Sequence, residues 1–458
     1  MEEYCNNLKR FLNNSDFYFL IIVVSMLFVP ISELFGELFY NLPYVFERAY
    51  LTALGLLGVL LFISDICLNK KISSISLVYI IFVLLAGISV SFSTPTLLTP
   101  LFISTGHTEE LFHYFAYFFL LYSATKLDLK KHAKYLLTSF IIVGCLHDFI
   151  GIFQILGLRI SESSYNMPEM HEQLRCIYGL TSHCNFYAAI ATMFVSISCI
   201  SYLLYKSSVF NVKWLFLIFF SSFCAICSST RLGILGVGAS ATLLVLFGII
   251  CYAINRKKLM KNTNGIYRRC FEINYYKIPV TILIIACSAL VVYIFLPHLL
   301  MPSIGEFFQD FSVITSNNQN LDQLGSFRSQ VWRYTIEYIM NVNFMTGTGI
   351  GNFYDVFFTN PELAKAHIVV NFAHNEYLHI LATQGVISFL FYISFFGTCI
   401  IRSVKTIIKS NDLFYQKSKI IFLFVLICYM VQAFFNCNIF ETYFYFWILL
   451  GIAYIYEK

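Results

Sequence analysis

The sequence predicts an all-α integral membrane protein with about twelve transmembrane helices. Hydrophobic residues make up 58% of the 458 residues and charged residues only 12%, whereas roughly a quarter of the residues of a soluble domain are charged. A transmembrane helix needs about 20 largely apolar residues, and twelve such runs follow one another along the chain. They lie near residues 17–34, 49–68, 72–92, 111–125, 135–158, 184–205, 214–229, 231–254, 278–297, 375–400, 418–434 and 441–456.

The distribution of Lys and Arg predicts the orientation of these runs. If the N-terminus is cytoplasmic, 23 of the 30 Lys and Arg residues lie on the cytoplasmic side. Cytoplasmic loops carry such an excess, so both termini are expected in the cytoplasm. The seven outer residues are Arg48, Arg159, Arg175, Arg231, Arg328, Arg333 and Lys365. The net charge of +5 follows from this bias and gives no reason to expect a nucleic-acid partner.

The chain is expected to form a single polytopic membrane domain, residues 1–458, with one long external connection at 298–373. This connection has a polar, turn-rich start at Ser316–Asp322 and a predicted helix at Ser326–Met340. Loops of this length are usually functional, so the segment is either a solvated cap on a transporter or a lid or floor of an active site. It also holds a glycine cluster, made of Gly347, Gly349 and Gly351.

Polar side chains open the tenth run, in the sequence His374-Asn375-Glu376-Tyr377. They could cap the helix, since Asn is a favoured capping residue. Imidazole is also the side chain best able to move a proton near neutral pH. His374 is therefore the candidate catalytic base.

Arg231 lies near the outer boundary, between two apolar runs, in Ser228-Ser229-Thr230-Arg231-Leu232-Gly233. A charge near hydrocarbon normally has a partner or faces a cavity. The alternative is a snorkelling anchor at the interface. Because positive charge is depleted on the outer side of membranes, an anionic ligand is favoured for Arg231.

Two further external segments carry arginine. In the predicted helix at Ser326–Met340, Arg328 and Trp332 share a face and Arg333 is offset to the side. Guanidinium binds phosphate through paired hydrogen bonds, although an amphipathic helix with solvated arginines fits the same pattern. The segment Arg175–Asn185 adds another Arg, His and Asn. Several arginines with one candidate base suit a lipid diphosphate donor and a hydroxyl nucleophile, and no metal-binding or ATP-binding motif accompanies them.

Two pairs of residues have alternative interpretations. His147 and Asp148 lie within an apolar run, where ionisable groups are functional candidates. Adjacent residues do not share a helix face, so helix packing is favoured over a proton relay. Cys176 and Cys184 could both face outside, and the pattern leaves a disulfide between them open.

These motifs resemble, in the same order, those of the O-antigen ligase and O-antigen polymerase family of polytopic glycosyltransferases. The resemblance covers about residues 175–390, and the N-terminal runs match only in hydropathy. Four motifs carry it: Arg175…Gly179…Asn185; Ser229-Thr230-Arg231-Leu232-Gly233; Arg328-xxx-Trp332 running on to Gly347-x-Gly349-x-Gly351; and His374-Asn375-xx-Leu378 followed by Gln384-Gly385. The sequence departs from the family at Leu180-Thr181-Ser182-His183, where an aromatic residue and a proline are common, and this departure bears on Arg175.

The resemblance implies glycosyl transfer at the outer face without metal, nucleotide or cofactor. His374 would act as general base on the acceptor hydroxyl, which attacks the anomeric carbon with inversion. The groups that would bind the donor diphosphate and stabilise its departing charge are Arg231, Arg328, Arg175 and Arg333. The supporting residues would be Asn375, which orients the imidazole or the acceptor, together with Trp332 and Asn185.

The implied partners are a polyprenyl (undecaprenyl) diphosphate-linked glycan donor, a lipid or glycan acceptor and membrane lipids. The implied location is the bacterial inner membrane, with the active site on the periplasmic side. A ligase places the glycan on a core lipid sugar, and a polymerase places it on another lipid-linked unit; the long loop before His374 slightly favours the ligase. A transporter of lipid-linked oligosaccharides is the alternative from another class. It would predict matched repeat halves, which the sequence does not display.

Overall fold

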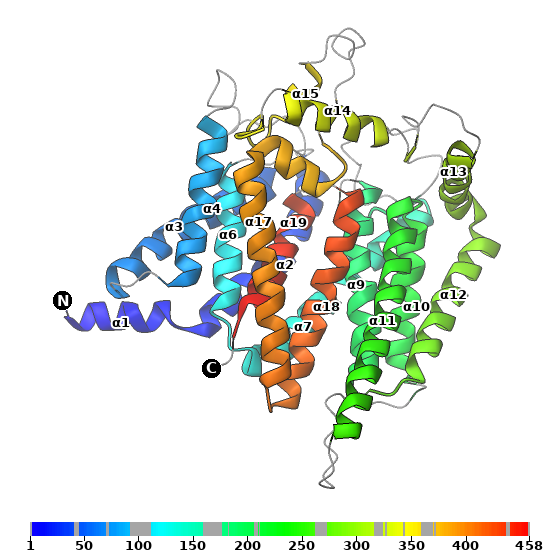
Figure 1. The fold of residues 1–458 in the computed structure, drawn as a ribbon, viewed down its shortest axis with the longest axis horizontal. Coiled ribbons are helices and arrows are strands. Elements are labelled where there is room, and N and C mark those ends of the chain that lie inside the picture. The colour runs from blue at the N-terminus through cyan, green and yellow to red at the C-terminus, as the bar shows by residue number, and fades with distance from the viewer. Residues whose placement is uncertain are drawn as a thin grey trace. The chain divides into compact units, whose positions relative to one another are not determined.

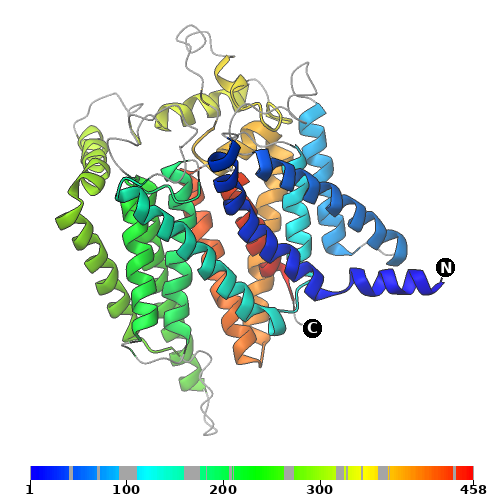
Figure 2. The same ribbon diagram turned by 180° about the vertical axis from the view of Figure 1, so that it is seen from behind.

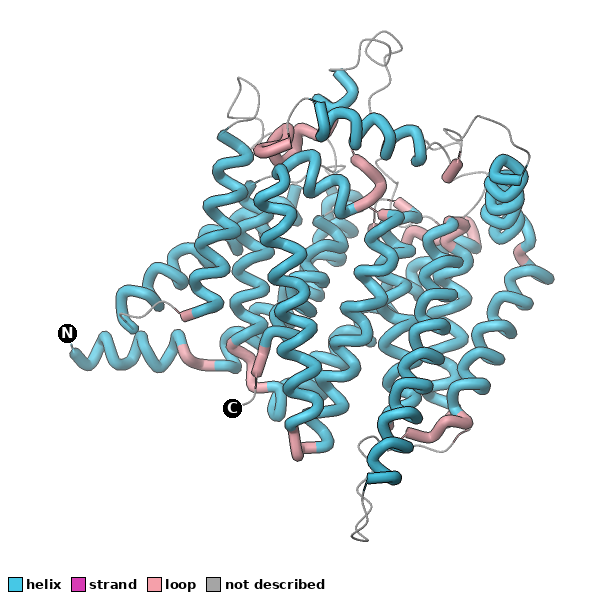
Figure 3. Tube along the Cα trace, in the orientation of Figure 1, coloured by secondary structure: helices cyan, strands magenta, loops and turns pink. Residues whose placement is uncertain are grey.

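The computed structural model describes most of the chain, and every described element is a helix (Figure 3). The described residues are 2–40, 45–69, 73–91, 111–158, 176–181, 183–205, 209, 211–261, 273–315, 324–325, 328–341, 344–358, 370, 372–436 and 440–456. They contain no strand, so the predicted all-α fold is confirmed for this part of the chain.

The helices follow the predicted apolar runs closely. In the first half of the chain they are α1 (Glu2–Leu12), α2 (Ser15–Tyr40), α3 (Val45–Asn69), α4 (Ser74–Ser91), α6 (Leu111–Thr125), α7 (Leu129–Ile155), α9 (Cys184–Leu204) and α10 (Val212–Cys227). In the second half they are α11 (Arg231–Lys261), α12 (Lys277–Phe295), α13 (Pro297–Thr315), α14 (Arg328–Asn341), α15 (Asp355–Phe358), α17 (Glu376–Lys409), α18 (Leu413–Gln432), the 3-10 turn η2 (Ala433–Phe435) and α19 (Phe440–Tyr454).

Each of the twelve predicted runs overlaps one of these helices. Among the described residues, eight helices are long and apolar enough to cross a membrane: Ser15–Ser32, Phe46–Leu68, Leu129–Ile155, Cys184–Leu204, Arg231–Arg256, Lys277–Phe295, Glu376–Lys409 and Leu413–Phe435. The apolar helices Ser74–Ser89 and Val212–Cys227 are shorter. With 15 residues each, α6 and α19 are about 22 Å long, against about 30 Å of hydrocarbon. The chain is therefore a multi-pass membrane protein, and the number twelve stays a prediction.

The segment 298–373 holds more helix than its sequence suggested. The predicted helix is confirmed as α14, but α13 was missed, because its prolines at 297 and 302 and its glycine resemble a loop. Proline is tolerated in the first turn of a helix, which is where Pro297 lies. Three apolar side chains of α13 are exposed, at spacings typical of one helix face: Phe308, Phe311 and Ile314. The predicted turn Ser316–Asp322 lies outside the described residues.

The chain divides into two compact units, and each combines segments that are distant in sequence. Unit 1 consists of Met1–Ser139, Glu306–Lys419 and Ala433–Lys458, and unit 2 of Phe140–Gly305 and Ile420–Gln432.

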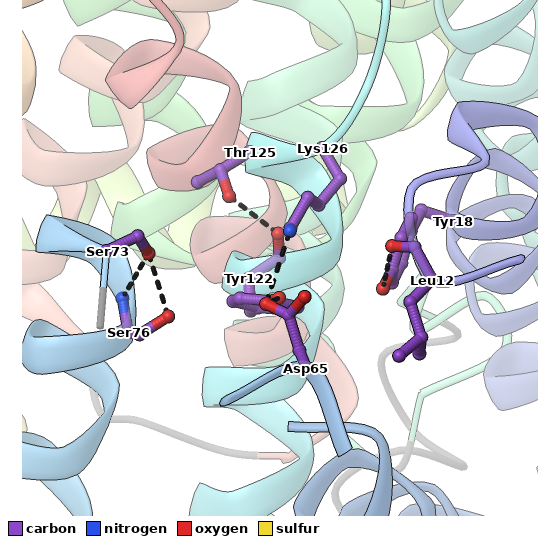
Figure 4. Close-up of polar contacts among 8 residues, drawn as sticks. All are labelled: Leu12, Tyr18, Asp65, Ser73, Ser76, Tyr122, Thr125 and Lys126. Carbon is purple, nitrogen blue, oxygen red and sulfur yellow. Dashed lines mark hydrogen bonds and ion pairs between the residues drawn. The ribbon is translucent and has the colours of Figure 1, made fainter. Parts of the chain in front are cut away.

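Aromatic packing and a buried ion pair hold unit 1 together. Helix α6 lies against α3, α4 and α19 (Figure 1). The Trp447 indole of α19 packs edge-on against Phe82 and Phe118. The buried Asp65 carboxylate of α3 accepts a hydrogen bond from the Tyr122 hydroxyl and lies 3.4 Å from the Lys126 ammonium (Figure 4). The charge of Asp65 within an apolar helix is thereby paired, as membrane segments require.

In unit 2, helix α9 is buried along its whole length and packs between α10 and α11 (Figure 2). Small residues let α9 and α11 approach closely, as is common between membrane helices. A side chain at Gly236 would overlap the Thr192 hydroxyl. One turn further along, the hydroxyls of Ser196 and Ser240 lie 2.9 Å apart.

Two buried lysines cap the C-terminal ends of α9 and α19. The Lys277 ammonium donates to the carbonyls of Tyr202 and Tyr205 at the end of α9, at 2.8 and 2.9 Å. The Lys419 ammonium donates to three carbonyls at the end of α19, those of Ile452, Ala453 and Ile455, at 2.7, 3.1 and 2.8 Å. A cation at a helix C-terminus satisfies free carbonyls and complements the helix dipole. Both ends belong to the side predicted to be cytoplasmic.

Replacing Lys419 by methionine is expected to destabilise the protein by about 1–3 kcal/mol, because the three carbonyls at the end of α19 lose a charged hydrogen-bond donor. Thermal unfolding of the purified protein in detergent would measure the loss. The matched control is Lys405→Met, since Lys405 is exposed on α17. Equal unfolding midpoints for the two variants would contradict the capping role.

Candidate functional site

His374 and Asn375 form the entrance to α17 in unit 1. Asn375 is the N-cap: its side-chain oxygen accepts a hydrogen bond from the Leu378 backbone N–H at 3.1 Å. The capping interpretation is therefore confirmed for Asn375. His374 precedes the helix with φ +49°, a left-handed conformation that is uncommon for residues other than glycine but enriched in Asn, Asp and His. The backbone thus places the His374 imidazole outside the regular helix.

The surroundings of His374 favour its neutral form. Its side chain is partly buried. Burial, together with the positive charge of Arg328, lowers the pKa of His374 to about 4. Desolvation and a nearby cation both disfavour an imidazolium. At neutral pH the ring is therefore uncharged and able to accept a proton.

Helix α14 brings Arg328 and Trp332 to this entrance. The Trp332 indole N–H donates to the carbonyl of Ala373, the residue before His374, at 2.9 Å. The apolar face of α14, which includes Val331 and Ile339, packs in one core cluster with residues of α17, and Figure 1 shows α14 lying across the end of unit 1 at which α17 begins. Arg328 is the first residue of α14. The helix therefore holds both side chains beside the His374 backbone.

Arg333 lies on a different face of α14. Its guanidinium is exposed, lies 3.3 Å from the Glu337 carboxylate and stacks over the Tyr334 ring at 4.5 Å. Arg333 is therefore offset from Arg328 and Trp332 around the helix, as its spacing predicted. Its role in binding the donor stays a prediction.

The glycine cluster packs against a break in α17. Gly385 has φ 77° and ψ 174°, which interrupts the helix. The backbone N–H groups of Thr348 and Gly349 donate to the carbonyls of Ala382 and Thr383 just before the break, both at 2.9 Å. Beyond it, the Val386 N–H donates to the Phe344 carbonyl at 3.1 Å. The loop 344–349 thereby fixes the direction of the first turns of α17, which begin just after His374 and Asn375.

The sequence did not single out two buried polar residues of unit 1, His379 and Asn352. His379 lies between the rings of Phe353 and Phe372, with centroid distances of 5.1 and 5.8 Å, and its Nδ1 has no hydrogen-bond partner among the described residues. The side-chain nitrogen of buried Asn352 is also without a partner in that part of the chain. Residues 375 and 379 share a helix face, so helical spacing after Asn375 could have identified His379.

Arg231 begins α11 in unit 2. The tight turn before it has Ser229 at φ +53°, and the Thr230 hydroxyl accepts the Gly233 N–H at 3.0 Å. A side chain at Gly233 would overlap the Ala225 carbonyl oxygen, which explains the glycine of the motif. Arg231 is buried, with 9% of its surface exposed. Because a helix N-terminus is itself positive, the position of Arg231 favours a nearby anion.

The external segment before α9 is anchored by side chains from α7. The Gln154 amide oxygen accepts the N–H groups of Tyr178 and Gly179, at 3.0 and 2.9 Å, and His147 Nδ1 accepts the Leu180 N–H at 3.2 Å. Neighbouring Asp148 accepts a hydrogen bond from the Tyr187 hydroxyl. The adjacent His147 and Asp148 thus bond to different partners, and the preference for helix packing over a proton relay stays a prediction.

The remaining predicted residues of this segment are only partly described. Arg175 lies outside the described residues. Asn185 is in the first turn of α9, where its backbone N–H donates to His183 Nδ1 at 3.0 Å. Cys176 and Cys184 are buried free thiols within hydrogen-bonding reach of each other. In the described part of the chain, no group of three or more His, Cys, Asp or Glu residues could hold a metal ion.

The structure therefore brings four predicted residues together in unit 1: His374, Asn375, Arg328 and Trp332. Arg231 and Asn185 belong to unit 2. Arg231 and Arg328 share one feature: each is the first residue of a helix.

A protein-family model matches part of the chain. Residues 216–393 match the family model described as O-Antigen ligase. This range includes Arg231, Arg328, Trp332, Arg333, His374 and Asn375, and excludes Arg175 and Asn185. No curated protein matches the chain. Residues 216–393 carry three of the four motifs noted in the sequence, and this part of the chain is similar to the O-antigen ligase family.

Proposed function

We propose that this chain is a metal-independent membrane glycosyltransferase of the O-antigen ligase type. It moves a glycan from an undecaprenyl diphosphate carrier to an acceptor hydroxyl of the lipid A-core, at the outer face of the bacterial inner membrane. The observation that carries the proposal is the position of His374 just before α17, next to the Ala373 carbonyl that accepts a hydrogen bond from Trp332 of α14. The family match over the same residues supports the substrate class.

In the proposed reaction, His374 accepts the proton of the acceptor hydroxyl. The acceptor oxygen forms a bond to the anomeric carbon of the glycan, and the bond from that carbon to the diphosphate oxygen breaks, with inversion. Undecaprenyl diphosphate leaves with the bonding electron pair. A positioned general base contributes about 10²–10⁴-fold to such a step.

The departing diphosphate needs positive charge where its own charge develops. Arg328 supplies a guanidinium at the N-terminus of α14, and Arg231 supplies one at the N-terminus of α11. Helix N-termini bind phosphate groups through free N–H groups and the helix dipole. The proposal assigns both arginines to the donor, with Arg175 and Arg333 as further donor contacts and Asn185 in support.

Trp332 and Asn375 act as positioning residues in this proposal. Trp332 holds the carbonyl that precedes His374, and Asn375 caps the helix that follows it. Both fix the imidazole relative to α14, where Arg328 lies. A displaced base loses much of its effect, because reacting atoms must come within about 3–3.5 Å.

The test is transfer by the purified protein in nanodiscs, with a polyprenyl-diphosphate-linked glycan, candidate acceptors, a chelator and no nucleotide. A core lipid that carries the glycan supports the ligase. A lengthened lipid-linked glycan would instead identify the polymerase, in which the acceptor is another lipid-linked unit. No transfer to any acceptor, together with movement of the lipid-linked glycan across vesicle membranes, would reject the enzyme in favour of a transporter.

The pH dependence of transfer tests the contact between Arg328 and His374. The charge of Arg328 contributes to the lowered pKa of His374, so Arg328→Gln should raise that pKa. Transfer needs the neutral imidazole, and its rate therefore falls as the pH drops through this pKa. The acidic limb of kcat/KM, which reports the free enzyme, is expected to move to higher pH in Arg328→Gln.

Arg328→Lys is the matched control for this shift. Lysine keeps the positive charge but cannot bind a phosphate through two parallel hydrogen bonds. We expect lower kcat/KM with the acidic limb near its wild-type position. An acidic limb that stays at the same pH in both variants would contradict the electrostatic coupling.

A further inference from the structure

A groove in unit 2, remote in sequence from His374 and Arg328, has a lining suited to a lipid. It lies between the last turns of α11 and the start of α12 and has a volume of about 1090 Å³. Helices α11 and α12 approach closely at one point, where a side chain at Gly248 would overlap the end of Ile278. On one side of this contact the groove is walled by Tyr252 and Tyr275, whose rings lie 5.9 Å apart and edge to face.

The groove is apolar at one end and polar at the other. Val245, Gly248 and Ile249 line it along the part of α11 that is apolar enough to cross a membrane. Toward the end of that helix the lining is mostly polar or aromatic, with Ile273 as an apolar member: Tyr252, Asn255, Arg256, Ile273, Asn274, Tyr275 and Tyr276. The Asn255 amide donates to the Tyr275 hydroxyl at 3.4 Å. Tyrosine at the level of the headgroups is typical of membrane interfaces, so the change marks the passage from acyl chains to headgroups.

The polar end of the groove lies in the most basic stretch of the chain. Residues 256–277 contain seven basic residues against one acidic residue, Glu272. Six of the basic residues are Arg256, Lys257, Lys258, Lys261, Arg268 and Arg269. The seventh, Lys277, is buried and donates to carbonyls at the end of α9, so it does not count toward a headgroup site. Basic residues next to a membrane helix attract anionic headgroups, by about 1 kcal/mol each. Arg256, which lines the groove itself, can hold a phosphate with two parallel hydrogen bonds.

We propose that this groove binds an anionic phospholipid. An acyl chain lies along Val245 and Ile249, and the phosphate lies at Arg256. The volume suits a headgroup and part of a chain, since ligand sites usually measure about 300–1,000 Å³. The site is separate from the proposed transfer reaction, and it belongs to the membrane side predicted to be cytoplasmic.

The test is titration of the detergent-purified full chain with phosphatidylglycerol or phosphatidylcholine, followed by native mass spectrometry. We expect one phosphatidylglycerol to bind at least about tenfold more tightly than phosphatidylcholine. Arg256→Gln, which removes the phosphate contact, should weaken the binding of phosphatidylglycerol by about tenfold. Ile249→Trp should do the same by filling the apolar end without changing the charge. Thermal unfolding of each variant checks that it remains folded.

Lys405→Gln is the matched control, because it removes one exposed charge from α17, which supplies no residue to the lining of the groove. It should leave phosphatidylglycerol binding unchanged. If Lys405→Gln weakens binding as much as Arg256→Gln does, general charge attraction explains the binding and the proposal is overturned. Equal affinity for the two lipids, or unchanged binding in Ile249→Trp, would also overturn it. These outcomes are independent of whether the chain transfers glycans.

Discussion

Replacing His374 by asparagine is expected to reduce glycan transfer by about 10²–10⁴-fold while leaving the protein folded. The reaction as proposed needs a neutral base beside the acceptor hydroxyl, and an asparagine amide cannot take up that proton. Asparagine is a better test than alanine because His374 has φ +49°, and asparagine accepts the left-handed conformation more readily than most residues. A loss of transfer can then be assigned to the imidazole and not to backbone strain.

The measurement is the initial rate of transfer in nanodiscs, with thermal unfolding as the check on folding. His374→Gly serves as a second variant, since glycine also adopts positive φ without strain. The matched control is His298→Asn, because His298 is an exposed histidine in the first turn of α13. Transfer at the wild-type rate by His374→Asn would remove His374 as the base, whatever the identity of the acceptor.

The sequence predicted the helices of this protein well, because membrane helices are long apolar runs. The helix that follows His374, the cap by Asn375 and the shared face of Arg328 and Trp332 could all be read from local patterns. Each depends on residues within about four positions of one another, and short-range geometry alone determines it.

The features that the sequence did not predict depend on contacts between distant segments. The break at Gly385 is held by the backbone of loop 344–349, some 40 residues earlier. The stacking of His379 requires Phe353 and Phe372 from two different parts of the connection. The contact between the Trp332 indole and the Ala373 carbonyl joins α14 to the residue before His374. Such long-range pairs leave no periodic signal in one sequence.

Replacing Gly385 by alanine is expected to destabilise the protein by about 2–6 kcal/mol and to abolish transfer. A side chain at this position would lie 2.5 Å from the carbonyl carbon of Met345 and closer still to its oxygen. The backbone at φ 77° and ψ 174° is in a region that only glycine adopts readily, at a cost of about 1–3 kcal/mol for other residues. Overpacking adds about 1–3 kcal/mol. Relief of the clash requires loop 344–349 to leave α17, which changes the direction of the turns that follow His374.

Gly397→Ala is the control within the same helix, because nothing lies within 4 Å of a side chain added at Gly397. It should unfold like the wild type, or slightly later, since alanine favours a helix over glycine by up to about 1 kcal/mol. Transfer and the unfolding midpoint, measured for both variants, separate two roles of the break in α17. Loss of both in Gly385→Ala means that the break supports the fold as well as the site. Loss of transfer alone means that loop 344–349 moves without unfolding the protein, and that the break serves to direct His374. Wild-type values of transfer and of the unfolding midpoint would show that α17 does not need the break at Gly385.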